Sequence, residues 1–316
     1  MNKPRIGITL GDPRGVGPEV TAAALEDARA ADIDVRLIGP RGLVLDAELA
    51  SLATVDVVGE WSQGGGARLA GELSARAIER SVELARAGQL DGIVTAPISK
   101  AALQAAGYDY PGHTELLSDL CGGVEVTMMM SAERTPLGGP LRLALLTAHM
   151  PLRAVPDALD EELIVTRTRI AVTALRSWWG IPHPRVAFAG LNPHAGEGGL
   201  FGNEEADIMQ PAIDRIAEDP ALDSLGIFPA DTVFRHTIEG RADLIVTPYH
   251  DVGLAVLKTV ARDEGVNVTA GLPFPRTSPD HGTAFDIAGT GAAHPGAMRA
   301  AIDLCVRFCN ATVTVP

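Results

Sequence analysis

The chain has 316 residues, enough for one large domain or for two medium domains that share an extended interface. Its 40 acidic residues outnumber its 26 basic residues, and the resulting formal charge of −14 at pH 7 disfavours binding to nucleic acid or to an anionic membrane. No apolar run approaches the roughly 20 residues of a membrane span, and the first run, at residues 6–10, is too short for the core of a signal peptide.

Predicted strands and helices alternate along the whole chain. Apolar runs bounded by turn residues predict strands at 5–10, 34–38 and 92–95. Apolar side chains recur with a helical period over 69–87, where Gly88 is the expected stop, and again over 161–179. This alternation favours an α/β protein with a mostly parallel sheet.

Three glycines follow the first predicted strand, at Gly11, Gly15 and Gly17. Such a segment can bring backbone amides to a phosphate at a helix N-terminus. The spacing matches neither the dinucleotide fingerprint GxGxxG nor the phosphate loop GxxxxGK followed by Ser or Thr. A tight turn from strand to helix is the structural alternative.

Three apolar runs each lead into a histidine set among turn residues. The runs and their histidines are 141–147 with His149, 185–190 with His194, and 244–247 with His250. Parallel buried strands end at one common edge, which is where α/β proteins bind ligands. Because imidazole is a common ligand of Zn, Co, Fe and Ni, the three histidines predict a divalent metal with open coordination positions. The alternative is that each histidine only satisfies polar groups of its own loop.

A second group of polar residues has the composition of a phosphate site. The string Gly-His-Thr-Glu at 112–115 supplies His113 and Thr114, although the threonine can instead cap the helix that follows. Later in the chain come a lysine, an asparagine within an apolar strand, and an arginine, which are Lys258, Asn267 and Arg276. Cations with amide or hydroxyl donors are what a phosphate dianion requires. The alternative is that these last three are separate surface groups.

Two of the three cysteines lie in an apolar, helix-like pattern near the C-terminus. Cys305 and Cys309 are four residues apart, so we expect them to pack in the interior. Together with Cys121 they form no framework of disulfide pairs. This usage predicts a reducing compartment, the cytoplasm.

Several longer strings occur in a fixed order from one end of the chain to the other. They lie at 11–13, 15–19, 112–115, 192–199, 229–232, 249–251, 265–267, 276–278 and 280–284. In these strings the chain closely resembles the family of 4-hydroxythreonine-4-phosphate dehydrogenases of pyridoxal phosphate biosynthesis.

The resemblance implies a fold like that of the isocitrate and isopropylmalate dehydrogenases, with two α/β lobes around a cleft. The expected first lobe is 1–110 with 276–316, and the expected second lobe is 111–275, which carries the metal ligands. Such a fold accounts for the missing dinucleotide fingerprint. The resemblance also implies a homodimer whose active site is completed across the interface.

Residue roles follow from the same resemblance. The implied metal ligands are His149, His194 and His250. The implied substrate contacts are His113, Thr114, Lys258, Asn267 and Arg276. Asp231 and Lys258 are the implied catalytic groups, and Asp231 is expected close to the metal or to the reacting carbon. No residue is assigned to the cofactor.

The implied reaction is oxidation of 4-(phosphooxy)-L-threonine by NAD or NADP. It gives 2-amino-3-oxo-4-(phosphooxy)butanoate, which loses carbon dioxide to form 3-amino-2-oxopropyl phosphate. A divalent metal, Zn, Mg, Mn or Co, lowers the pKa of the bound hydroxyl and then polarises the new carbonyl. The nicotinamide cofactor accepts the hydride.

Some residues depart from the family pattern, namely Arg14, Phe228, Val252 and Pro279. They leave open a sister dehydrogenase for D-threonate or D-erythronate 4-phosphate. A metal-dependent phosphatase would need no cofactor, and a non-catalytic phosphosugar-binding protein would need no metal-ligating histidines. Ser278 near Asp280 and His281 suggests a serine hydrolase, but no GxSxG elbow accompanies it.

Overall fold

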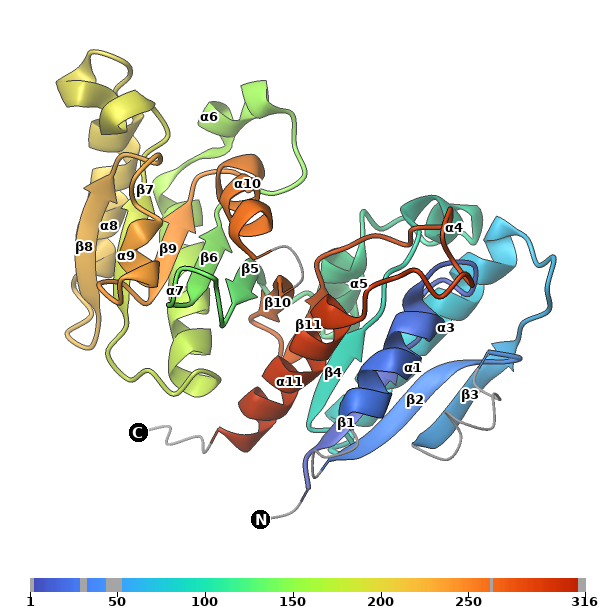
Figure 1. Ribbon diagram of the computed structural model, residues 1–316. Helices are drawn as coiled ribbons and strands as arrows, with labels where there is room; N and C mark the ends of the chain where they lie inside the picture. The colour runs from blue at the N-terminus through green and yellow to red at the C-terminus, as the bar shows by residue number, and fades with distance from the viewer. Residues whose placement is uncertain (1–2, 29–32, 44–52, 262–263, 312–316) are drawn as a thin grey trace. The chain divides into compact units, whose positions relative to one another are not determined.

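A computed structural model describes residues 3–28, 33–43, 53–261 and 264–311. The chain forms two compact α/β units, Met1–Glu125 with Leu272–Asn310, and Val126–Gly271 with Ala311 (Figure 1). The predicted α/β class is confirmed. The first unit extends past the expected division at residue 110, because the helix His113–Leu120 packs against a long helix of that unit.

The sheet of the first unit is wholly parallel, in the order β3-β2-β1-β4-β11. Its strands are β1 (Arg5–Thr9), β2 (Asp34–Arg41), β3 (Thr54–Glu60), β4 (Gly92–Thr95) and β11 (Arg276–Pro279). The side chains of Ile6, Ile8 and Ile93 are fully buried. Continuous apolar runs such as these are typical of strands covered on both faces.

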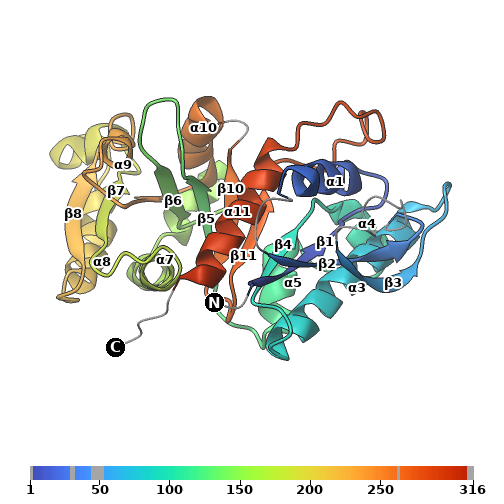
Figure 2. The same cartoon turned by 60° about the horizontal axis from the view of Figure 1, so that its bottom comes forward.

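Helices cover both faces of this sheet. They are α1 (Gly17–Ala28), α3 (Ala67–Arg86), α4 (Lys100–Ala105), α5 (His113–Leu120) and α11 (Gly296–Asn310). Figure 2 shows α1 beside α11 on one face, while α4 and α5 pack against α3 on the other. The helix predicted over 69–87 is confirmed as α3, and Gly88 follows it with φ +66°. Ser99 caps α4 by accepting a hydrogen bond from the amide of Ala102.

The glycine segment after β1 is a tight turn closed by its own backbone. A β-carbon on Gly11 would lie 2.2 Å from the carbonyl oxygen of Pro97, and one on Gly17 would lie 2.4 Å from that of Leu10. Gly15 is similarly close to the carbonyl oxygen of Thr283, at 2.7 Å. These glycines are needed because chain segments touch there, so the turn interpretation accounts for them without a phosphate.

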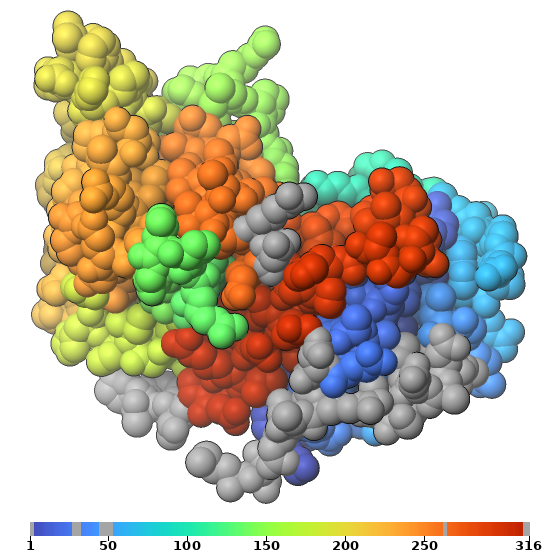
Figure 3. Space-filling view, in the orientation of Figure 1, coloured from blue at the N-terminus to red at the C-terminus, as the bar shows by residue number. Residues whose placement is uncertain are grey.

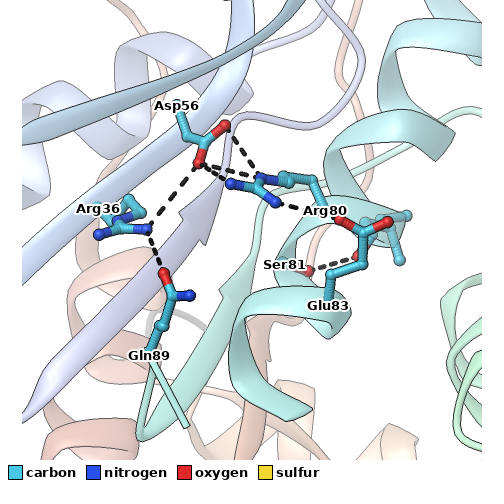
Figure 4. Close-up of polar contacts among 7 residues, drawn as sticks. Arg36, Asp56, Arg80, Ser81, Glu83 and Gln89 are labelled. Carbon is cyan, nitrogen blue, oxygen red and sulfur yellow. Dashed lines mark hydrogen bonds and ion pairs between the residues drawn. The ribbon is translucent and has the colours of Figure 1, made fainter. Parts of the chain in front are cut away.

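A polar network on the first unit ties the sheet edge to α3 (Figure 4). Asp56 of β3 pairs with Arg80 of α3 at 3.1 Å and with Arg36 of β2 at 4.0 Å. Arg80 also pairs with Glu83, and Arg36 donates to Gln89. These groups are partly exposed, so we expect them to orient the edge strand more than to stabilise the fold.

The sheet of the second unit has the order β10-β5-β6-β9-β7-β8. Its strands are β5 (Thr127–Ala132), β6 (Leu141–Leu145), β7 (Arg185–Ala189), β8 (Asp223–Phe228), β9 (Leu244–Thr247) and β10 (Val266–Ala270). β5 runs antiparallel to both β10 and β6, whereas β6, β9, β7 and β8 are mutually parallel. The expectation of a mostly parallel sheet therefore holds, with β5 as the reversed strand.

The helices of the second unit are α6 (Val155–Ala158), α7 (Glu161–Ser177), α8 (Gln210–Ile216), α9 (Arg235–Ile238) and α10 (His250–Val260). α7 confirms the predicted amphipathic helix, and the Asp160 carboxylate caps it by accepting from the amide of Leu163 at 2.7 Å. α10 was not predicted as a helix. Among the residues that the structure describes, no helix is both long and apolar enough to cross a membrane.

A largely buried ion pair joins β5, β6 and the end of α7. The carboxylate of Glu133 accepts from Arg142 at 2.8 Å through each oxygen, and also from Ser131 and from Trp179 Nε1. Burial alone would raise the pKa of Glu133, but these donors and the charge of Arg142 lower it to about 2. The carboxylate therefore stays ionised throughout the neutral range.

We predict that Glu133→Gln destabilises the second unit at neutral pH and that its effect shrinks in acid. The folded pKa lies below the unfolded value of 4.5. The stabilisation is therefore complete above pH 4.5 and is lost as the pH falls toward about 2. The shift corresponds to on the order of 3 kcal/mol. Urea unfolding at several pH values measures this difference in stability.

Glu264→Gln, at an exposed pair with Arg134, is the matched control and should cost under about 0.5 kcal/mol. A pH-independent difference for Glu133→Gln would contradict the prediction.

Candidate active site

The three predicted histidines follow three neighbouring parallel strands of the second unit. β6 leads to His149, β9 to His250 and β7 to His194, and these strands are adjacent in the order β6-β9-β7. Because parallel strands end at the same edge, all three turns lie at one edge of this sheet. Asp231 follows β8, the next strand in the same order. The sequence prediction of a shared edge is thus met by the topology.

His149 and His250 lie next to each other at this edge. Their ring centroids are 5.6 Å apart. His250 is the first residue of α10, and its Nδ1 lies 2.7 Å from the carboxylate of Asp251. A carboxylate bonded to one imidazole nitrogen fixes the orientation of the ring, and the other nitrogen, Nε2, is then the one that can coordinate a metal. Both rings line a pocket of about 440 Å³ with Tyr249.

His194 lies in a loop with an unusual backbone. The segment Pro193–Gly199 turns in the left-handed sense, since φ is positive at every residue of 194–198. Three of these residues are not glycine: His194 at +54°, Ala195 at +52° and Glu197 at +47°. Left-handed backbone costs roughly 1–2 kcal/mol per such residue, so the loop stores on the order of 3–6 kcal/mol. Strain of this size, held in place, is typical of functional segments.

The described residues of one chain do not form a complete group of metal ligands. Within the described ranges, no three His, Cys, Asp or Glu side chains converge closely enough to hold an ion. The ring of His194 faces Phe201, with centroids 6.1 Å apart. His149 and His250 therefore offer two neighbouring imidazole groups, a ligand type that suits Zn or Co, while His194 lies on its own loop after β7.

The other expected residues of the second unit are placed on different elements. Asp231 is exposed in the turn after β8. Lys258 is exposed in the last turn of α10, about 12 Å along the helix axis from His250. Asn267 lies in β10, where its buried Oδ1 has no hydrogen-bond partner among the described residues. A buried acceptor of this kind fits a bound ligand that donates a hydrogen bond.

Arg276 and His113 occur together in the first unit. Arg276 begins β11, its side chain is 1% exposed, and it donates to the hydroxyl of Thr95 at 2.5 Å. Burial lowers the pKa of Arg276 to about 9, and Glu115 acts in the opposite direction. A buried guanidinium gains from an anion, and its planar fork matches a phosphate. The sequence predicted the strand 92–95, but it gave no indication that Thr95 would be the partner of Arg276.

His113 begins α5, with Gly112 before it as the N-cap. Its buried Nε2 has no hydrogen-bond partner among the described residues. Burial lowers the pKa of His113 well below its usual range, and the charge of Arg276 lowers it further. Thr114 lies inside the first turn rather than at the cap, so the capping alternative is wrong. The neutral imidazole, Arg276 and the helix N-terminus form an arrangement suited to an anionic ligand.

The whole chain resembles known proteins of one family. It matches the model of the family "Pyridoxal phosphate biosynthetic protein PdxA" over residues 17–305. The chain belongs to this family. A 4-hydroxythreonine-4-phosphate dehydrogenase of Trichlorobacter lovleyi is 39% identical, with 97% of this chain and 98% of that protein covered. One of Synechocystis sp. is 40% identical, with 98% and 96% covered.

Solved structures agree with this placement in the PdxA family. A crystal structure of 4-hydroxythreonine-4-phosphate dehydrogenase from Klebsiella pneumoniae matches with a TM-score of 0.83 and 37% sequence identity. The match covers 98% of this chain and 98% of that one.

The four residues that the resemblance predicts to depart from the family pattern have structural roles. Phe228 and Val252 pack against the hydrophobic core of the second unit. Pro279 is buried at the end of β11. Arg14 pairs with Asp12 at 2.7 Å, and its guanidinium lies over the ring of Phe285. Val252 thus packs on the core although it neighbours His250 in sequence.

We predict that His113 stays neutral well below the usual histidine range. In a carbon-detected NMR titration, its ring signal should not shift between about pH 8 and about pH 5.5, because burial and Arg276 both oppose its protonation. Arg276→Gln removes the nearby charge and should raise the pKa of His113. An inflection near the usual value of about 6.5 in the unmodified protein would contradict this.

Proposed function

We propose that the chain is a metal-dependent, NAD- or NADP-dependent dehydrogenase. Its substrate is 4-(phosphooxy)-L-threonine, and the product 2-amino-3-oxo-4-(phosphooxy)butanoate decarboxylates to 3-amino-2-oxopropyl phosphate in pyridoxal 5'-phosphate biosynthesis. The observation that carries the proposal is the buried Arg276 beside the unsatisfied Nε2 of His113 in a chain of the PdxA family. It provides an anion site of the kind that a phosphorylated substrate needs.

The metal is proposed to be held by His149, His194 and His250. Support comes from their common sheet edge and from the close pair of His149 and His250. A divalent ion bound there would lower the pKa of the substrate hydroxyl and would polarise the carbonyl that forms from it. Imidazole donors favour Zn or Co, whereas a contribution from Asp231 or from the substrate carboxylate would admit Mg or Mn.

Five residues are proposed to contact the substrate. His113, Thr114 and Arg276 come from the first unit, and Lys258 and Asn267 from the second. Asp231 is the proposed acceptor for the proton that leaves the substrate hydroxyl, since it shares the edge of the metal-binding turns. The ammonium of Lys258 is the proposed second catalytic group, which stabilises negative charge that develops as carbon dioxide leaves.

The nicotinamide cofactor is proposed as the hydride acceptor because the relatives are named dehydrogenases. The glycine turn after β1 does not fit its pyrophosphate, because carbonyl groups fill the space beside Gly11 and Gly17. No residue of this chain is therefore assigned to the cofactor, and the choice between NAD and NADP is left to assay.

The active form is proposed to be a homodimer that completes the site. In the described part of one chain, no complete group of metal ligands forms. Large apolar side chains are exposed on the segments that follow β6 and β7, which are Met150, Leu152, Leu200 and Phe201. These segments stand out at one end of the second unit in Figure 3. Exposed apolar groups at a functional edge favour a protein contact there.

A reducing compartment, the cytoplasm, is proposed for the enzyme. Cys121, Cys305 and Cys309 are all free thiols. Cys305 is buried, and its hydrogen bond with Cys309, together with burial, raises its pKa well above the usual range. Such a thiol is a packing group with low reactivity.

The proposed activity is tested by following NAD or NADP reduction with a panel of phosphorylated acids. The panel contains 4-(phosphooxy)-L-threonine and the 4-phosphates of D-threonate and D-erythronate, each with and without Zn, Mg, Mn or Co. We expect metal-dependent reduction, highest with the threonine compound. Preference for a threonate would indicate the sister dehydrogenase. No reduction with any compound would favour a phosphosugar-binding protein.

We predict that His194→Ala abolishes turnover and weakens metal binding. The substitution removes one imidazole donor and leaves the core unchanged, because His194 is exposed. Calorimetric titration of the metal-free protein with Zn²⁺ and a turnover assay measure the two effects. His183→Ala, at an exposed histidine in the loop before β7, is the matched control. A His194→Ala variant with full activity and full metal occupancy would exclude the three-histidine site.

We predict that Arg276→Ala raises the Michaelis constant for the phosphorylated substrate by one to two orders of magnitude. This is roughly the 1.5–3 kcal/mol of one charge-assisted hydrogen bond. Arg134→Ala, at an arginine that is 82% exposed, should leave the constant unchanged. An unaltered constant in the folded Arg276→Ala protein would remove Arg276 from the phosphate site.

A further inference from the structure

A buried carboxylate forms hydrogen bonds with the start of the strained loop that carries His194. Glu205 is 6% exposed. One of its oxygens accepts from the backbone amide of Asn192 at 2.7 Å, and the other accepts from the Asn192 side chain at 3.0 Å. Asn192 directly precedes the segment Pro193–Gly199, so both bonds act on the start of the left-handed run.

The same carboxylate occupies the space beside two glycines, one before the loop and one within it. A β-carbon on Gly196 would lie 3.0 Å from Oε2 of Glu205, and one on Gly190 would lie 3.2 Å from Oε1. Gly190 comes just before the loop and Gly196 lies at its centre. Glu205 is therefore bonded to the start of the loop and lies close beside its middle.

The local helix geometry brings the side chain of Glu205 next to the loop. Glu205–Met209 is a widened π-helical turn in which the amide of Gln210 bonds to the carbonyl of Glu205. Pro211 follows and has no amide hydrogen to give to the carbonyl of Asp207, which favours a wide turn before it. Neighbouring Glu204 adds one bond of its own, accepting from the Asn192 side chain at 2.7 Å.

Glu205 has no role in the core that would account for its burial. None of the ion pairs among the described residues includes it, and its side-chain bonds go to Asn192 alone. Burying a carboxylate whose only hydrogen-bond partners are amides costs folding free energy. Most residues of the segment 193–199 are exposed, so packing against the core does little to fix its strained backbone, and we expect the carboxylate to supply that support.

We propose that Glu205 is a positioning residue that sets the direction of the His194 imidazole by holding the left-handed loop. The inference rests on the proposed function, because it gives His194 the task of binding the metal. Residues that orient a metal ligand without touching the metal change its affinity by about 10- to 100-fold when they are replaced.

The test is calorimetric titration of the metal-free full chain with Zn²⁺. We expect Glu205→Ala to weaken Zn²⁺ binding by about 10- to 100-fold. Glu205→Gln keeps an acceptor for the Asn192 amide but places an NH₂ group against the Asn192 side chain, so its loss should be smaller. Asp207→Ala, at an exposed carboxylate on the same helical segment, is the matched control and should bind as the unmodified protein does.

A double variant separates positioning from general destabilisation. In the His194→Ala background, Glu205→Ala should cause no further loss of Zn²⁺ affinity, because Glu205 acts through His194. An additional loss of the same size in that background would overturn the proposal. So would unchanged Zn²⁺ affinity in a folded Glu205→Ala protein when His194→Ala does weaken binding. If His194→Ala itself binds Zn²⁺ normally, the proposed metal site fails instead, and the inference fails with it.

A second variant serves if Glu205→Ala does not fold. Asn192→Ala removes the side-chain bonds to Glu205 and Glu204 but leaves the backbone bond to Glu205. We expect it to weaken Zn²⁺ binding severalfold, again without further loss in the His194→Ala background. Unchanged affinity in Asn192→Ala would then overturn the proposal.

Discussion

Parallel pairing of β6, β9, β7 and β8 is the constraint on which the candidate metal site depends. Each of these strands ends at the same edge of the sheet, so strand pairing brings together residues about a hundred positions apart in sequence, and beside them the Thr147 hydroxyl donates to the carbonyl of Pro248 at 2.8 Å. His149 and His250 show the result, with rings 5.6 Å apart. The reversed strand β5 lies outside this group and ends at the opposite edge. The fold thus provides the common sheet edge, and the turns after the strands provide the histidine side chains.

Three buried charges show how the surroundings of a group decide its use. Glu133 is neutralised by Arg142 and held by two further donors, which makes it a structural ion pair. Arg276 is fully buried with a hydroxyl as a neighbour, and its pKa is lowered to about 9. A charge in that state gains free energy from an arriving anion. Glu205 is the third case. Its carboxylate accepts hydrogen bonds from the neutral amides of Asn192, at the start of the loop that carries His194. Burial alone does not distinguish these roles; the partners do.

The sequence predicted the parts of the structure that depend on local patterns. Continuous apolar runs located β4 and β9, and the helical period located α3 up to Gly88. α10 was missed because it begins at His250, within a string that reads as a turn. The bond between Asn192 and Glu205 spans thirteen positions and depends on a π-helical turn, which no periodicity encodes. The only signal for it was the density of glycines in 196–199 together with a proline at 211.

The three histidines are held by three different local structures, and this difference bears on how the proposed metal would be bound. His250 is fixed by a helix start and by Asp251, whereas His149 follows its strand through a short turn. His194 stands on a strained loop with its ring against exposed Phe201. A ligand on a strained loop needs an external brace, because its backbone would otherwise relax toward common dihedral angles. The first two histidines can pair within the unit by topology alone. The third depends on local backbone geometry, so in the proposed metal site the position of His194 would be set by the residues that hold that loop.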